Sequence, residues 1–377
     1  MKQSSSDTLR GARPSLRSSE DRSIAPQTVF VGMSGGVDSS VAAMLLVEQG
    51  YNVVGVYMKN WSQDLPGMKC PWAEDLADAK RVAVKLGIPF EVWDFEKSYR
   101  QKVVEYMLDE FKKGNTPNPD VMCNQEIKFK LFYEKAMERG ADFIATGHYA
   151  RTGGAEANFC GLLRAADENK DQTYFLYRIS DEALAHTLFP IGEMLKPEVK
   201  KLAAGHGLHN AYKKESMGVC FVGEVGMKDF LKEYIDIAPG EIREIESDKI
   251  LGYHEGAIFY TIGQRHGLYL SGVAGEINDG MPYYVVKKDL EKNIVYVSKN
   301  LNHTAIWTKE LKLRDVIART DKVGATLLVR LRHRAPLIPA KFDGEKLVFE
   351  SEIKRPASGQ SAVLYDGEVC VGGGIIV

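Results

Sequence analysis

The residues with the clearest chemical potential form a glycine- and serine-rich segment near the start of the chain. Residues 34–39 read Ser-Gly-Gly-Val-Asp-Ser. They follow an apolar run at Thr28–Val31, typical of a buried strand, and precede apolar residues at helical spacing. Backbone N–H groups in such a loop, together with the N-terminus of the next helix, attract phosphate oxygens. The segment therefore predicts a phosphate-binding loop.

The loop lacks the Gly-Lys-Ser/Thr sequence that cradles a nucleoside triphosphate in Walker-type proteins. A loop without this lysine suits a reaction in which pyrophosphate leaves and ATP becomes AMP. We expect the Asp38 carboxylate to hold Mg²⁺, which would neutralise the charge developing on pyrophosphate. The alternative is an ordinary glycine-rich turn with a serine at the helix N-cap.

A carboxylate and a thiol stand three residues apart in a second segment. Residues 118–130 read Asn-Pro-Asp-Val-Met-Cys-Asn-Gln-Glu-Ile-Lys-Phe-Lys, and two prolines in and just before this segment stiffen it. We expect a helix to begin near Asn124, whose N-terminus would lower the pKa of the Cys123 thiol. Asp120 and Cys123 are therefore candidate catalytic residues.

Cys220 is the second thiol in a setting that favours reactivity. Glycines flank it on both sides, and Lys213 and Lys214 precede it, so we expect a mobile site that favours the thiolate. Taken alone, Cys123 and Cys220 do not establish a shared site, because buried free cysteine is the commoner role. The remaining cysteines lack such settings and are interpreted as structural or incidental: Cys70, Cys160 and Cys370.

The composition is that of a folded, water-soluble chain. Its 377 residues correspond to two or three domains at about 150 residues each. With 49 basic and 51 acidic residues the net charge is −2, which excludes a general polybasic coat and leaves RNA binding to local patches. Five cysteines without a Cys-x-x-Cys pair disfavour a disulfide scaffold and favour a reducing compartment. The sequence has no apolar run of about 18 residues, so we expect no membrane-spanning helix.

The elements that must position these residues change character along the chain. In the first part, strands alternate with helical patterns, which indicates a parallel α/β sheet. The expected strands there are Thr28–Val31, Val53–Met58, Phe90–Phe95 and Asp142–Thr146. After Pro239, short β-type runs dominate, spaced as hairpins by Lys292-Asn293, Asp343-Gly344 and Asp366-Gly367. These runs are Ala257–Thr261, Tyr283–Lys287, Ile294–Ser298, Thr326–Arg330, Leu347–Glu350 and Ser361–Tyr365.

Residues 34–39 resemble the signature of the ATP pyrophosphatase, or PP-loop, superfamily, whose members adenylate an oxygen and let a nucleophile displace AMP. With its other motifs, the chain from about Val29 to Ile376 resembles the bacterial tRNA-specific 2-thiouridylase (MnmA/TrmU) family. The supporting segments, in chain order, are Met58–Trp61, Ala145–Tyr149, Asn169–Tyr177, Thr261–Leu268 and Gly372–Ile376.

The resemblance implies a transferase, a tRNA-uridine 2-sulfurtransferase that replaces the C2 oxygen of the wobble uridine with sulfur. Mg²⁺-ATP would adenylate that oxygen and release pyrophosphate, and AMP would leave during sulfur transfer. Cys220 would carry a persulfide from a sulfur-relay or cysteine desulfurase-linked donor protein. Its terminal sulfur would attack C2, or would be released as sulfide when Cys123 attacks as the nucleophile. A transient Cys123–Cys220 disulfide would then form and be reduced. Asp120 would act as general base or hold the target base.

The resemblance also assigns binding residues. The ATP site would consist of Gly32, Met33, Ser34, Gly35, Gly36, Val37, Asp38, Ser39, Met58 and Gly147. The target base would touch Asn118, Pro119 and Asp120, and tRNA would meet His148, Lys170, Asp171, Gln172, Arg332, His333 and Gln360. Lys170 and Arg332 could neutralise phosphates, while His333, where family members more often have tyrosine, could stack on a base.

The implied architecture is an α/β, Rossmann-like PP-loop domain with a parallel sheet, a small central domain and a C-terminal β-barrel. We place the catalytic domain at residues 28–224, the central β-rich domain at 225–299 and the barrel at 300–377, the last two contacting tRNA. Residues 1–27 are interpreted as a disordered tail, because they have no apolar stretch and include three acidic residues. We expect a cytoplasmic monomer without membrane attachment, the mitochondrial matrix being the less favoured compartment.

Three alternatives stay open at this point. The chain could be another PP-loop enzyme that makes a small metabolite, although Cys123 and Cys220 would then be idle. It could be a non-catalytic RNA-binding protein that kept the ATP fold. Asp120, Cys123 and Cys220 could instead ligate an iron–sulfur cluster with one open position. We favour the persulfide route.

Overall fold

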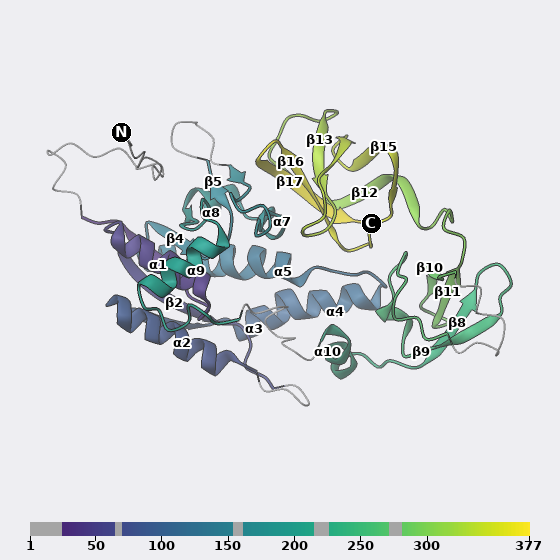
Figure 1. Cartoon of the computed structure of the whole chain (residues 1–377), viewed down its shortest axis with the longest axis horizontal. Helices are drawn as coiled ribbons and strands as arrows, with labels where there is room; N and C mark the ends of the chain where they lie inside the picture. Colours follow the sequence, from purple (N-terminus) through teal and green to yellow (C-terminus); the bar gives the residue numbers. More distant parts are fainter. Residues whose placement is uncertain (1–24, 65–69, 154–160, 215–225, 271–280) are drawn as a thin grey trace, which may run out of the picture.

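In the computed structural model, the described residues are 25–64, 70–153, 161–214, 226–270 and 281–377. Figure 1 shows the α/β part at one end of the long axis, a small sheet at the other end, and the C-terminal barrel above the helices that connect them. The expected tail, except for residues 25–27, lies outside the described residues, as do Cys160 and Cys220.

The α/β part is built on a five-stranded parallel sheet. Its strands are β1 (Thr28–Gly32), β2 (Asn52–Lys59), β3 (Phe90–Asp94), β4 (Phe143–Thr146) and β7 (Thr187–Leu188), in the order β3-β2-β1-β4-β7. The four strands expected from the sequence are confirmed, whereas β7 is two residues long and carries no readable pattern. The strand order reverses between β1 and β4, and a parallel sheet binds ligands at such a switch point.

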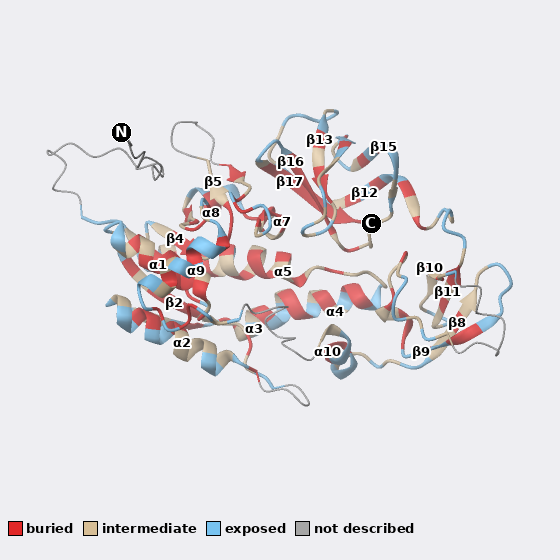
Figure 2. Cartoon of the chain, viewed as in Figure 1, coloured by how far each residue is buried: buried red, intermediate tan, exposed pale blue. Residues whose placement is uncertain are grey.

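Helices cover both faces of this sheet. On one face lie α1 (Val37–Glu48), α2 (Trp72–Leu86) and α9 (Lys196–Gly205), which share one hydrophobic core. Figure 2 shows how much of α1 is buried. The second core includes side chains of α3 (Glu96–Tyr99), the π-helical Arg100–Val104, α4 (Glu105–Lys112), α5 (Pro119–Met122), the π-helical Cys123–Leu131 and α6 (Phe132–Glu138).

Shorter elements follow in the chain and lead to the central domain. They are β5 (Arg151–Thr152), β6 (Leu162–Leu163), α7 (Thr173–Leu176), α8 (Asp181–Ala185) and α10 (Met227–Tyr234). No helix among the described residues is long and apolar enough to cross a membrane.

The central domain is a four-stranded sheet of order β10-β11-β8-β9. Its strands are β8 (Gly240–Glu244), β9 (Ile250–His254), β10 (Tyr284–Asp289) and β11 (Ile294–Ser298). The strand expected at Ala257–Thr261 is wrong: Ala257–Phe259 forms a 3₁₀ turn. Ala257 and Tyr260 are buried in the domain core there, and an apolar run of that length can fill a core without pairing as a strand.

The C-terminal domain is a closed six-stranded barrel. Its strands are β12 (Trp307–Ala318), β13 (Thr326–Arg330), β14 (Ile338–Phe342), β15 (Lys346–Lys354), β16 (Ser361–Asp366) and β17 (Val369–Ile376), and β12 pairs with β17 to close it. All three expected hairpin turns connect antiparallel neighbours. The β5–β6 hairpin of the α/β part extends this sheet, since Leu162 and Leu163 pair with β17.

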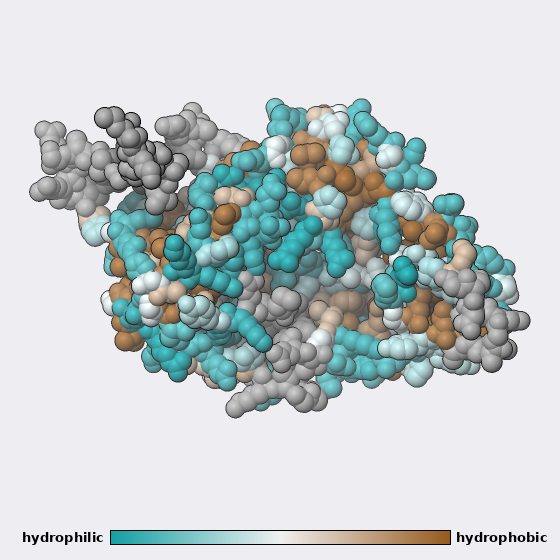
Figure 3. All heavy atoms as spheres, viewed as in Figure 1, coloured by the Kyte–Doolittle hydropathy of each residue, from teal (hydrophilic) through white to brown (hydrophobic). Residues whose placement is uncertain are grey.

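The glycine run near the C-terminus is a packing requirement. A Cβ on Gly373 would lie 2.9 Å from the ring of Tyr177, and one on Gly372, at φ +133°, would lie 2.0 Å from the Ile317 carbonyl oxygen. Strand β17 can therefore approach both β12 and the α/β part closely. In Figure 3, apolar side chains gather on the visible face of the barrel, while the visible face of the α/β part is largely hydrophilic.

Candidate nucleotide and thiol site

Residues 32–39, the nucleotide loop, leave the carboxyl end of β1 and enter α1. Gly35 has φ +79°, and a Cβ there would lie 2.3 Å from the Asp75 carbonyl oxygen, so that position accepts only glycine. The Ser34 N–H donates to Ser39 Oγ at 3.2 Å, and Ser39 Oγ donates to the Gly36 carbonyl oxygen at 3.2 Å. The loop is thus a tight turn at the start of a helix, as a phosphate site requires.

Met58 and Gly147, expected at the same site, do lie against this loop. A Cβ on Gly32 would come within 2.8 Å of Met58 Cε, and one on Gly147 would lie 2.4 Å from the Ser39 nitrogen. The end of β4 therefore packs directly on the first turn of α1. The structure brings all the expected nucleotide residues to the switch point of the sheet.

Asp38 has a cationic partner that the sequence did not indicate. The Lys196 Nζ donates to Asp38 Oδ1 at 2.6 Å and to Oδ2 at 2.7 Å, and the Tyr149 hydroxyl donates to Oδ1 at 3.0 Å. Lys196 begins α9 and is 6% exposed. Buried lysine is rare unless paired, and here the pairing places an ammonium beside a loop motif that contains no lysine. Lys196 is remote in the chain from residues 34–39, so local spacing gives no signal for it.

The fit of Mg²⁺ depends on Asp38 and on what the nucleotide provides. Among the described residues, no group of three histidine, cysteine or acidic side chains could hold a metal ion by itself. Mg²⁺ is commonly held by one or two carboxylates together with substrate phosphates. One carboxylate next to a phosphate loop fits that kind of site.

The helix that carries Cys123 begins earlier than the sequence predicted. Asn118 is the N-cap of α5, its Oδ1 accepting from the Asp120 N–H at 3.1 Å and the Val121 N–H at 3.4 Å, and Pro119 occupies the first turn. Asn at the cap followed by proline is a strong start signal. The expected start near Asn124 is therefore wrong. Cys123 lies one turn inside the helix, 3% exposed, so the helix N-terminus acts less on its thiol than expected.

Asp120, Lys128 and His148 are electrostatically linked in this site. Burial raises the pKa of the Asp120 carboxyl, and the Lys128 ammonium partly opposes that rise. Burial, with a smaller effect of Lys128, lowers the pKa of His148 well below 6.5. Lys128 Nζ lies 3.5 Å from His148 Nε2, and Thr146 Oγ1 lies 2.8 Å from Nδ1. Because an ammonium can only donate, Nε2 accepts and the Nδ1–H donates to Thr146. Lys128 thus belongs to the site.

The predicted RNA-contact residues 170–172 divide into two groups. Asp171 is 1% exposed, and its carboxylate accepts from Arg330 Nη1 at 2.7 Å and from the Thr173 hydroxyl at 2.7 Å. An RNA contact by Asp171 does not fit this structure, because its oxygens join the α/β part to the barrel. Lys170 is half-buried. Gln172 Oε1 accepts from the N–H of Tyr149 at 2.8 Å, and the hydroxyl of the same tyrosine donates to Asp38.

The predicted contact residues of the barrel lie at its edge facing the α/β part. Arg332 is exposed on the β13–β14 turn, and the His333 ring packs against Phe175 with ring centroids 4.5 Å apart and ring planes tilted by 44°. Burial and the neighbouring Arg334 and Arg330 lower the pKa of His333 to about 4, so its imidazole is neutral. Gln360 Nε2 donates to the Thr116 carbonyl oxygen at 2.7 Å, just before the Asn118 cap.

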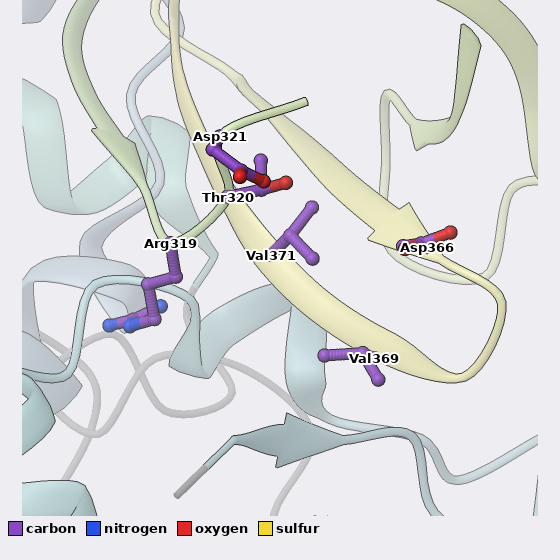
Figure 4. Close-up of a pocket in the computed structure, with 6 residues that line it drawn as sticks. All are labelled: Arg319, Thr320, Asp321, Asp366, Val369 and Val371. Atoms are coloured by element: carbon purple, nitrogen blue, oxygen red, sulfur yellow. The ribbon is translucent and has the colours of Figure 1, made fainter. Parts of the chain in front are cut away.

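The other described cysteines have inert surroundings. Cys70 and Cys370 are both buried, and burial raises the pKa of both thiols, that of Cys370 to about 12. Thiolate chemistry is suppressed at such sites. The surface pocket in Figure 4 is also separate from the site: it is lined by Arg319, Asp321, Asp366 and neighbouring residues, and the Arg319 guanidinium donates to Asp181 and to backbone carbonyls of the α/β part.

This chain is similar to known protein families and to known proteins over most of its length. Family models match residues 27–224 (tRNA methyl transferase HUP domain), 228–299 (tRNA methyl transferase PRC-barrel domain) and 308–376 (aminomethyltransferase beta-barrel domain). The tRNA-specific 2-thiouridylase MnmA of Lactiplantibacillus plantarum is 46% identical over 357 residues, which are 92% of this chain and 94% of the relative. The chain belongs to the tRNA-specific 2-thiouridylase family.

Other members of the 2-thiouridylase family match equally well. MnmA 1 of Geobacillus kaustophilus is 48% identical over 356 residues, covering 92% of this chain and 95% of the relative. Among solved structures, a 4-thiouridine synthetase–RNA complex with bound ATP is 17% identical, with a TM-score of 0.34 over 55% of this chain and 50% of that chain. The NMN synthetase of Francisella tularensis is 19% identical, with a TM-score of 0.34 over 51% of this chain and 67% of that chain.

Proposed function

We propose that this protein catalyses the ATP-dependent 2-thiolation of the wobble uridine of tRNA, with release of AMP and pyrophosphate. The observation that carries the proposal is that backbone packing, one side-chain contact and one electrostatic interaction link the nucleotide loop to the thiol segment. Gly147 packs on Ser39, the adjacent His148 contacts Lys128, and Lys128 acts on Asp120, one helical turn before Cys123. An oxygen adenylated at the nucleotide loop could therefore be presented to the Cys123 thiol.

The nucleotide loop would bind the phosphates of ATP through its backbone N–H groups and the start of α1. Bound Mg²⁺, held by Asp38, would supply neutralising charge for the leaving pyrophosphate. Lys196, now paired with Asp38, would turn its ammonium toward the phosphates when they bind. Together these groups stabilise pyrophosphate as a leaving group.

Asp120 would accept the uridine proton while the C2 oxygen takes up the adenylyl group. Because burial raises the pKa of Asp120, its carboxylate is a stronger base than an exposed aspartate. The Asn118 cap and Pro119 hold its backbone in the first helical turn, so the carboxyl has a fixed direction. The neutral His148 imidazole and the Lys128 ammonium next to it would contact the RNA or the nucleotide.

Sulfur would arrive as a persulfide on Cys220, which lies outside the described residues. Attack of the Cys123 thiolate on the inner Cys220 sulfur would form a disulfide and release the outer sulfur as hydrosulfide. The hydrosulfide would add to C2, and AMP would leave with the original oxygen. A thiol reductant would then return two electrons to the Cys123–Cys220 disulfide.

The partners in this proposal are tRNA and a persulfide-carrying donor protein, acting on a monomer in the cytoplasm. Two family-model descriptions name a tRNA methyl transferase. A methyl transfer does not require an adenylated oxygen, whereas replacing oxygen by sulfur does. The nucleotide loop therefore favours thiolation.

A reconstitution tests the function and the sulfur route together. Unmodified tRNA, Mg²⁺-ATP and a persulfide donor are incubated with the protein, and the digested RNA is analysed by mass spectrometry. We expect 2-thiouridine together with AMP rather than ADP, and no thiouridine with Cys123→Ser. AMP without thiouridine from a persulfide, but thiouridine after anaerobic iron–sulfur loading, would favour the cluster alternative. Neither AMP nor thiouridine would reject the proposed function.

A further inference from the structure

Residues 113–117, the junction segment, connect α4 to α5 and end directly before the Asn118 cap. Gly114 has φ +81°, and Asn115 Nδ2 donates to Glu110 Oε2 at 2.8 Å. Glu110 is 3% exposed and also pairs with Arg314 of the barrel at 2.5 Å. A buried carboxylate thus joins the start of this segment to a second domain.

The barrel holds both backbone polar groups of Thr116. The Thr116 N–H donates to the Ser358 carbonyl oxygen at 2.7 Å, and its carbonyl oxygen accepts from Gln360 Nε2 at 2.7 Å. A Cβ on Gly359, at φ +90°, would lie 3.0 Å from the Thr116 nitrogen. The barrel loop therefore presses against this residue without an intervening side chain.

The central domain holds the same segment from another side. Lys288 Nζ donates to the Gly114 carbonyl oxygen at 2.8 Å, and Thr261 Oγ1 lies 3.3 Å from Thr116 Oγ1. Leu290 packs against Gly114, where a Cβ would lie 2.7 Å from its Cδ1 atom. Burial of the Lys288 amine lowers its pKa to about 8. Removing an amine from water costs free energy unless the amine is hydrogen-bonded, and here the bond to the Gly114 carbonyl oxygen offsets that cost.

We propose that Lys288 is a positioning residue that, with Thr261 and Gln360, makes the junction segment couple the two C-terminal domains to Asp120 and Cys123. This inference rests on the proposed function, because it assumes that tRNA docks on those domains. Pro117 and the Asn118 cap restrict the backbone between Thr116 and the helix that carries Cys123, so this connection is short and stiff. A displacement of either domain therefore moves the helix that carries the nucleophile.

The first test does not depend on thiolation. Cys123 is 3% exposed, so its alkylation requires local opening of the helix, whose rate can be followed by mass spectrometry of its peptide. In Lys288→Met we expect Cys123 to be alkylated faster, by roughly fivefold or more, with the Cys370 rate unchanged as an internal reference. Lys287→Met, on the opposite face of the same strand, is the matched control and should leave the Cys123 rate unchanged. An unchanged Cys123 rate in Lys288→Met overturns the inference.

The second test uses single-turnover thiolation by the wild type and the same variants. We expect Lys288→Met to lose roughly 10- to 100-fold in rate with tRNA affinity and ATP binding unchanged, and Lys288→Arg to restore most of the rate. Thr261→Val, a milder change, should show the same pattern with a smaller loss. If the wild type makes no thiouridine, the proposed function fails while the alkylation result still stands. A loss of tRNA affinity that accounts for the whole rate change would assign Lys288 to RNA binding and overturn the positioning role.

Discussion

The nucleotide loop and the thiol helix are positioned in different ways. The nucleotide loop is fixed by its own sequence: a strand, two glycines, two serines and a helix start, with Gly35 forced into a left-handed conformation. The thiol helix takes its start from Asn118 but its placement from Glu110, Lys288 and Gln360, the last two in other domains. The turn of residues 32–39 thus follows largely from residue types within the segment, whereas the placement of the helix that carries Cys123 depends on contacts with the two other domains.

We expect the largest effect from a substitution in the nucleotide loop at Gly35. In Gly35→Ala the added Cβ would meet the Asp75 carbonyl oxygen at 2.3 Å in a backbone conformation unsuited to alanine. We expect ATP-dependent AMP formation to fall by more than about 100-fold, measured with saturating tRNA. Gly36→Ala is the control, because its Cβ meets only Ser34 Oγ at 3.4 Å and its φ is −81°. Equal losses in both variants would contradict the steric argument.

Lys196 is the tertiary element of the nucleotide site, and its removal should come next in size. Lys196→Met leaves Asp38 without the ammonium that contacts both its oxygens. We expect AMP formation to fall about 10- to 100-fold while tRNA affinity is retained, as measured by filter binding. Lys200→Met, an exposed position on the same helix, should be unaffected. Normal turnover in Lys196→Met would remove the lysine from the mechanism.

Substitutions of Arg330 and Arg332 can distinguish residues that dock the barrel on the α/β part from residues that contact RNA. Arg330→Met would leave the buried Asp171 carboxylate without its 2.7 Å partner from the barrel. We expect a loss of about 3–5 kcal/mol in the free energy of unfolding, measured by denaturant titration. Arg332→Met, at an exposed position nearby, should instead keep the stability and weaken tRNA binding with a shallower salt dependence. The reverse pattern would restore Asp171 as an RNA contact.

The smallest effect is a pH dependence at the barrel edge. His333 has a pKa near 4 when folded and about 6.5 when unfolded, so the unfolded state binds more protons between these values. The stability contributed by neutral His333 is therefore complete above about pH 6.5 and is lost as the pH falls toward 4. Over that pH range we expect the free energy of unfolding of the wild type to fall by roughly 1–2 kcal/mol more than that of His333→Phe. Thermal unfolding at each pH measures the difference. Parallel pH profiles would show that His333 does not titrate in this window.

The predicted fold succeeded where periodicity was strong. The four strands of the α/β sheet and the hairpins of the barrel were correctly expected, because alternating or continuous apolar runs between turn residues identify them. The two-residue strand β7 has no periodic pattern to reveal it, and the apolar run at Ala257–Phe259 forms a 3₁₀ turn because a buried run need not pair as a strand. Asn118 followed by Pro119 is itself a helix-start signal, whereas the prolines by themselves predict only a stiff loop.

The sequence alone determined the family, the nucleotide loop and the identity of the candidate carboxylate and thiol, because these depend on residue types within a few positions of one another. Tertiary structure decided what those residues contact. It paired Asp38 with Lys196, withdrew Asp171 from the surface, and joined the junction segment to two other domains. Each of these contacts links residues remote in the chain, and no local spacing encodes a meeting that depends on how three cores pack.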